Sequence, residues 1–137
     1  MKRAVWAVLL VGLVAGAEDK KDDPLKGTWV VVTMVRNGQS NENAVGDKVT
    51  FEDGTMTIRG KNRENKGAYK LDASKDPKQV DITPSDGLDK GMAHVGIYAL
   101  DKGELKLCIG RPGKDRPTAF ESKEGSEHML VKLKRQE

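Results

Sequence analysis

Segments in which apolar residues alternate with polar ones recur along most of the chain. From Glu104 to Ile109, Leu105 and Leu107 share one face with Ile109, and from His128 to Lys134 every second residue is again apolar. A period of two is typical of β-strands that bury one face. The pattern predicts eight strands, with a ninth left open over 117–121; the eight are residues 27–35, 48–51, 55–59, 67–71, 79–83, 92–100, 104–109 and 128–134.

The residues between these segments favour tight antiparallel connections. Asp53-Gly54 separates two alternating segments, which is a strong hairpin signal, and Asp101-Lys102-Gly103 marks a second tight turn. The one helix candidate, residues 39–45, is long enough for about one turn. Short, evenly spaced strands indicate an all-β antiparallel barrel or sandwich. We favour a barrel of eight to nine strands, because closure leaves no exposed sheet edge.

The first strand departs from alternation. Trp29, Val31 and Val35 are apolar, and so are Val30, Val32 and Met34 between them. A strand with one face in water should alternate. We therefore expect either that residues 37–46 cover the outer face or that a partner does, and we favour the first.

Several motifs resemble a known family. Residues 25–29, with Gly27 two positions before Trp29, resemble the opening of lipocalin-like barrels. An ordered set over roughly residues 25–135 is similar to a domain of unknown function that recurs as many paralogues in planctomycete bacteria; the set comprises Gly67–Asp72, Val80–Pro84, Asp86-Gly87, Lys90-Gly91, Gly96–Tyr98, Leu105–Cys108, Arg116-Pro117, Phe120 and Leu133–Arg135. The resemblance implies an exported, lipocalin-like β-barrel and no particular activity.

The N-terminus has the pattern of an export signal. Lys2 and Arg3 precede an apolar run over residues 4–14, and residues 15–17 offer a small-x-small cleavage pattern. The run is shorter than the roughly 20 residues of a bilayer span, so we prefer a cleaved signal to an uncleaved anchor. A lipoprotein anchor would need a cysteine where Ala17 stands. We predict a signal peptide (1–17), a flexible leader (18–24), one barrel domain (25–135), and a secreted or periplasmic location.

Composition agrees with one domain and limits its partners. The chain has 137 residues, 33% of them charged, with a net charge of +3 that becomes +1 without Lys2 and Arg3. A nearly neutral surface offers no general attraction to nucleic acid. Two basic segments, residues 59–66 and 111–116, are read as solvated loops, or as holders of an anionic group at a barrel mouth. They lack aromatic residues for base stacking.

Catalytic and metal chemistry have weak support. Cys108 is the only cysteine, and His94 and His128 are the only histidines. A nucleophilic thiol needs a lowered pKa and a base within reach, and neither is indicated here. No spacing typical of a metal site is present, so we predict no catalytic residues, no metal and no cofactor.

We therefore expect a non-enzymatic, monomeric binding protein whose partner is a small apolar ligand or an envelope protein. The expected ligand-lining residues are Trp29, Val31, Phe51, Tyr69, Ile97 and Leu107. Two alternatives stay open: a hydrolase that uses Cys108 or a pair of carboxylates, and a purely structural interaction module. Trp29 itself is expected to be structural, with Arg135, Lys134 or Lys132 of the last strand covering its indole ring.

Overall fold

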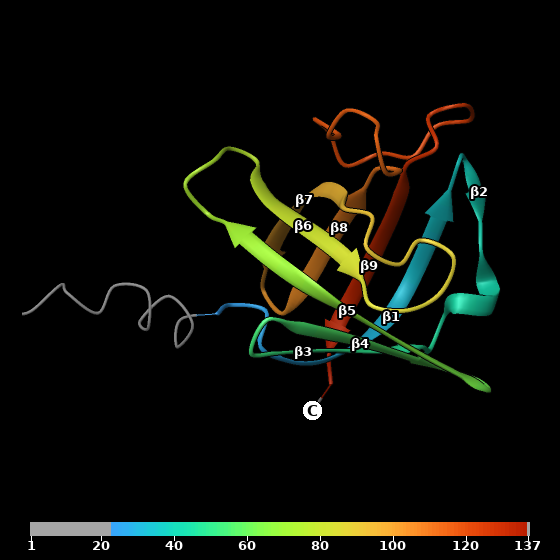
Figure 1. Ribbon diagram of the computed structural model, residues 1–137, viewed down its shortest axis with the longest axis vertical. Helices are drawn as coiled ribbons and strands as arrows, with labels where there is room; N and C mark the ends of the chain where they lie inside the picture. The colour runs from blue at the N-terminus through green and yellow to red at the C-terminus, as the bar shows by residue number, and fades with distance from the viewer. Residues whose placement is uncertain (1–22, 137) are drawn as a thin grey trace, which may run out of the picture.

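A computed structural model describes residues 23–136, so the predicted signal peptide and most of the leader lie outside the described residues. Nine strands and one short 3-10 helix are present in this range (Figure 1). In chain order they are β1 (Gly27–Arg36), β2 (Gln39–Ser40), η2 (Glu42–Ala44), β3 (Lys48–Glu52), β4 (Thr55–Gly60), β5 (Arg63–Asp72), β6 (Lys78–Pro84), β7 (His94–Asp101), β8 (Glu104–Ile109) and β9 (Met129–Arg135).

The strands close on themselves. Each strand from β3 to β8 pairs antiparallel with the next, and β1 pairs with both β3 and β9. This confirms the predicted all-β antiparallel barrel. The closed barrel consists of the eight strands β1 and β3–β9, and β2 is an extra strand beside β1. The turn at Asp53-Gly54 has positive φ at both residues, as the type I′ hairpin signal requires.

The two ends of the barrel differ. At one end, which we call the base, Trp29 and Leu105 belong to a core of fully buried side chains. We call the other end the mouth. There β1 ends at Arg36 and β8 ends at Ile109, and there β7 begins at His94 and β9 begins at Met129. Segment 110–128 connects β8 to β9 at the mouth and forms the orange loops of Figure 1.

Segment 37–47 runs beside β1, as the continuous apolar pattern of that strand suggested. The amide of Val31 donates to the Asp47 carbonyl at 2.9 Å, and the amide of Asn41 donates to the Met34 carbonyl at 2.8 Å. A bulge between Val31 and Thr33 shifts the register against β9. Cover is partial, since Val32 keeps 37% of its surface exposed.

One local expectation was wrong, one was met, and the strand left open over 117–121 is absent. The basic segment 59–66 is mostly strand, because β4 and β5 continue through it to a turn at 61–62. The single helical turn expected within 39–45 is η2. No helix among the described residues is both long and apolar enough to cross a membrane.

Candidate functional site

Register and alternation decide which side chains reach the mouth from the inner face. Directly paired residues of antiparallel strands point to the same side of the sheet. Ile109 pairs with Met129, and Met129 pairs with Arg36. Ile109 is a core residue, so Arg36 and Met129 share the inner face with it. His94 is inward for the same reason, because it pairs with the core residue Ile82.

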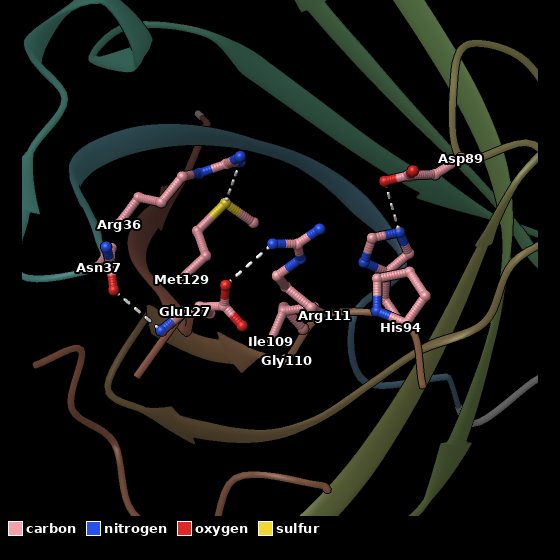
Figure 2. Close-up of a pocket in the computed structure, with 10 residues that line it drawn as sticks. Arg36, Asn37, Asp89, His94, Ile109, Gly110, Arg111, Glu127 and Met129 are labelled. Carbon is pink, nitrogen blue, oxygen red and sulfur yellow. Dashed lines mark hydrogen bonds and ion pairs between the residues drawn. The ribbon is translucent and has the colours of Figure 1, made fainter. Parts of the chain in front are cut away.

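These residues surround a cavity of about 380 Å³ at the mouth. We call it the mouth pocket; Arg36, His94, Ile109, Arg111, Glu127 and Met129 contribute to its lining. Figure 2 shows Met129 between the side chains of Arg36 and Arg111, with Ile109 below Arg111 and His94 on the right. The pocket therefore combines cationic groups with an apolar wall.

Two carboxylates, those of Glu127 and Asp89, face basic groups of this pocket. Nη1 of Arg111 lies 2.9 Å from Oε2 of Glu127, and Nε2 of His94 lies 3.3 Å from Oδ2 of Asp89 (Figure 2). Nη2 of Arg36 instead donates to the sulfur of Met129 at 3.1 Å. Within residues 23–136, Arg36 has no carboxylate at ion-pair distance.

A second, more apolar hollow of about 290 Å³ adjoins the mouth pocket. Met56, Ile58 and Ile82 form its inner side, and Leu88 lies on its outer side. Asp89 lines both cavities. A ligand that spans both cavities would thus meet the arginines in one and an apolar wall in the other, with the Asp89 carboxylate lining both.

The loop 85–93 holds Asp89 in this position. The amide of Gly91 donates a hydrogen bond to the Pro84 carbonyl at 2.9 Å, and the Asp86 carboxylate accepts one from the amide of Lys66 at 3.3 Å. Gly87 and Gly91 have positive φ, which residues with a side chain rarely adopt. These two glycines thus allow the loop to turn at the mouth and return to β7.

The six predicted lining residues are all buried, but they do not form one surface. Trp29, Val31, Phe51, Tyr69 and Leu107 belong to the interior core. Ile97 pairs with Cys108, while its neighbour Tyr98 pairs with Leu107 and belongs to the core. Ile97 therefore lies on the outer face of β7, and Tyr98 takes the inward position that we expected for Ile97.

Cys108 lies on the same outer face as Ile97 and is fully buried. Its thiol donates to the carbonyl of Glu121 at 3.4 Å, so segment 110–128 covers it. Burial raises the pKa of the Cys108 thiol, and the charge of Glu121 adds to this effect. A buried thiol with a raised pKa is poorly suited to act as a nucleophile.

Sequence reasoning identified only part of the mouth pocket. Arg111 came from the basic segment 111–116, for which an anion site at a barrel mouth was one of the two readings. Arg36 and His94 were missed. The alternation of β1 could have identified Arg36: Met34 faces the core, and a residue two positions later in a strand points to the same side. In contrast, Arg116 of the same basic segment donates a hydrogen bond to Asp81 of β6 and so lies against the barrel.

Comparison with known proteins adds little to this geometry. No protein-family model matches the sequence, and no curated protein matches it significantly. Among solved structures, the chain is similar to a crystal structure of a DUF4847 family protein from Bacteroides vulgatus ATCC 8482. The two are 16% identical, with 85% of this chain and 99% of that chain covered and a TM-score of 0.49. Similarity at this level assigns no function.

Proposed function

We propose that this protein is a non-catalytic binding domain that holds a small amphipathic carboxylate at its barrel mouth. The observation that supports this most directly is Arg36, an inward cation at the mouth without a carboxylate partner among the described residues. Arg111 stands in the same pocket, and the apolar hollow adjoins it. The expected ligand thus moves from the interior core around Trp29 and Leu107 to the mouth, and it gains an acidic group.

The carboxylate would bind the guanidinium groups. Arginine presents two parallel N–H donors that match the two oxygens of a carboxylate, and such charge-assisted bonds are stronger than neutral ones. Arg36 would give up only a hydrogen bond to the Met129 sulfur, which is a weak acceptor. Arg111 is held by a largely exposed ion pair with Glu127, and exposed pairs contribute only about 0.2–1 kcal/mol.

The apolar part of the ligand would lie against Met56, Ile58 and Ile82 in the adjoining hollow. Each methylene group removed from water contributes about 0.8 kcal/mol, before the cost of association. An alkyl chain of medium length would therefore add measurably to the affinity of the head group. We expect affinity to rise with chain length until the hollow is full.

The export pattern of the N-terminus supports a role outside the cytoplasm, in the periplasm or the medium. We expect the protein to act there as a monomer. N-terminal sequencing of the protein from its own host checks this, with Glu18 expected as the first residue. The buried Cys108 supports a binding role over a thiol-dependent hydrolase.

Titration with sodium octanoate, followed by backbone amide shifts in ¹⁵N-labelled protein, tests the proposal. We expect saturable shifts at Arg36, His94 and Arg111, and much weaker binding of 1-octanol, which lacks the charge. Arg36→Gln and Arg111→Gln should each weaken octanoate binding about tenfold, the loss of one charge-assisted interaction. Lys75→Gln removes a cation from the β5–β6 turn at the base and should leave affinity unchanged.

Equal binding of octanoate and octanol would show that the arginines play no part. Shifts that never saturate, or that are the same in all three variants, would overturn the proposed site. Octanoate binding that depends on Trp29 and Leu107 but not on Arg36 would return the ligand to the barrel interior.

A further inference from the structure

A separate hollow lies at the base, away from the mouth pocket. Its volume is about 620 Å³, and Asp23, Asp53, Tyr69, Leu71, Asp72 and Tyr98 contribute to its lining. We call it the basal hollow. The N-terminal residues of the described chain, the β3–β4 turn and the β5–β6 connection meet there. None of these residues lines the mouth pocket.

The Tyr98 hydroxyl is an unexplained polar group at this hollow. Tyr98 is 2% exposed, and its hydroxyl is buried without a hydrogen-bond partner among the described residues. A buried hydroxyl without a partner costs about 1–3 kcal/mol relative to one that is satisfied. Phenylalanine would fill the same position without that cost. Because Tyr98 lines the basal hollow, a ligand atom in the hollow would give the hydroxyl its missing partner once the side chains that cover the oxygen move aside.

The charge around the hollow is negative. Asp23 accepts a hydrogen bond from the Tyr69 hydroxyl, and Asp72 accepts two from Ser74, at 2.6 and 3.1 Å. None of the ion pairs in the described part of the chain involves Asp23, Asp53 or Asp72. The bonds from Ser74 lower the pKa of Asp72, and the charge of Lys75 has a smaller effect in the same direction. Asp72 is therefore ionised at neutral pH.

We propose that the basal hollow binds a small organic ammonium ion, with the carboxylates supplying charge and the Tyr98 hydroxyl accepting an N–H bond. An ammonium group donates three hydrogen bonds and accepts none, which fits carboxylates and a free hydroxyl oxygen. Leu71 and the tyrosine rings provide an apolar wall for its carbon chain. A metal ion fits less well, because no three acidic, histidine or cysteine side chains within residues 23–136 converge at metal-binding distance.

Calorimetric titration of the protein with 1,4-diaminobutane tests the inference, with 1,4-butanediol as the uncharged probe. We expect saturable binding of the diamine and none of the diol. Tyr98→Phe removes a single oxygen atom and should weaken diamine binding about tenfold. Asp53→Asn and Asp72→Asn should weaken it similarly, whereas Asp101→Asn, at the nearby β7–β8 turn outside the hollow, should not.

Folding of each variant is checked by circular dichroism, and Tyr98→Phe is expected to unfold at the same or a higher temperature because it removes an unpaired hydroxyl. Unchanged diamine affinity in Tyr98→Phe would overturn the inference. So would an equal loss in Asp101→Asn, since that would reflect diffuse attraction to the acidic end of the barrel. Octanoate binding at the mouth is measured separately in each variant, so either site can fail without the other.

Discussion

The guanidinium of Arg135 lies 4.3 Å from the centre of the Trp29 ring and closes the base of the barrel. The two residues are direct partners of β1 and β9, so they share a face. Arg135 also donates to the carbonyls of Lys26, at 2.8 Å, and Pro24, at 3.2 Å. The Trp29 indole donates to the Leu25 carbonyl at 2.9 Å. The expected cation over the tryptophan is thus confirmed, and register selects Arg135 from the three candidates.

Replacing this cation should loosen the base. Arg135→Gln removes the cation–π contact and at least one hydrogen bond to a main-chain carbonyl, so we expect the free energy of unfolding to fall by about 1–2 kcal/mol. Urea unfolding followed by far-ultraviolet circular dichroism measures this. Lys134→Gln changes the adjacent exposed residue on the outer face and should have a negligible effect. Equal losses in the two variants would show that the arginine acts only through net charge.

Alternation and turn chemistry were enough to predict the barrel. In β8 and β9 the inward residues are apolar except for Arg135 at the end of β9, and most outward residues are charged, so the alternation indicated the correct inward face. The turn at Lys102-Gly103, with positive φ at both residues, was predicted by its glycine. Local rules of this kind depend on near neighbours in the chain, and the sequence displays those directly.

The face of β7 could not be predicted in the same way. Ile97 and Tyr98 are both buried, so the strand shows no alternation at its centre. The outer face is covered by segment 110–128, which holds no strand and has no periodic pattern. Its contacts join residues distant in the chain, such as Cys108 with Glu121 and Arg116 with Gly96. Only the paired register shows which side of β7 is inward.

Arg116 should anchor that covering segment to the barrel. Its Nη1 donates to Oδ1 of Asp81 at 2.8 Å and to the Gly96 carbonyl at 2.9 Å. Arg116→Ala should lower the free energy of unfolding by about 2 kcal/mol, because these acceptors lose a charged donor. Hydrogen exchange should also become faster across residues 111–127.

The control for this prediction is Lys114→Ala, an exposed residue of the same segment. It should change neither exchange nor stability. Normal exchange of residues 111–127 in Arg116→Ala would mean that other contacts, such as that of Cys108, hold the segment.

Stability should decline in alkaline solution. Burial raises the pKa of Cys108, and burial together with the hydrogen bond to Asp23 raises that of Tyr69. In the unfolded chain these groups ionise near about pH 8.5 and 10, below their folded pKa values. The unfolded state therefore loses protons first, and the stabilisation is complete below about pH 8.5 and is lost as the pH rises through the folded values.

Urea unfolding at pH 7.5 and 9.5 measures this decline. Cys108→Ala should reduce the difference between the two pH values, because alanine cannot ionise. It should also lower the free energy of unfolding at pH 7.5 by about 1–2 kcal/mol, the cost of a small cavity. An unchanged difference in Cys108→Ala would assign the decline to the tyrosines.

The mouth pocket was harder to predict than the fold, since its members come from separate strands and a loop. Arg36, His94 and Arg111 lie far apart in the chain, and each alone reads as an ordinary solvated residue. Closure of the barrel pairs Arg36 of β1 with Met129 of β9, and Met129 also pairs with Ile109 at the end of β8, two residues before Arg111. The grouping of charged side chains at the pocket therefore depends on the strand register, which cannot be read from composition.

Removing the acid that competes for Arg111 should strengthen binding at the mouth. Oε2 of Glu127 lies 2.9 Å from Nη1 of Arg111, and both side chains are substantially exposed. Glu127→Gln should therefore change the free energy of unfolding by less than about 1 kcal/mol. It frees one guanidinium and removes a negative charge that repels the ligand, so octanoate affinity should rise about three- to tenfold, the effect of roughly 1 kcal/mol between charges about 4 Å apart in water.

Glu124→Gln, an exposed change in the same segment, should leave affinity unaltered. The gain should vanish when Arg111→Gln is combined with Glu127→Gln, and a gain that survives in this double variant would mean that the acid acts on Arg36 or on the pocket as a whole.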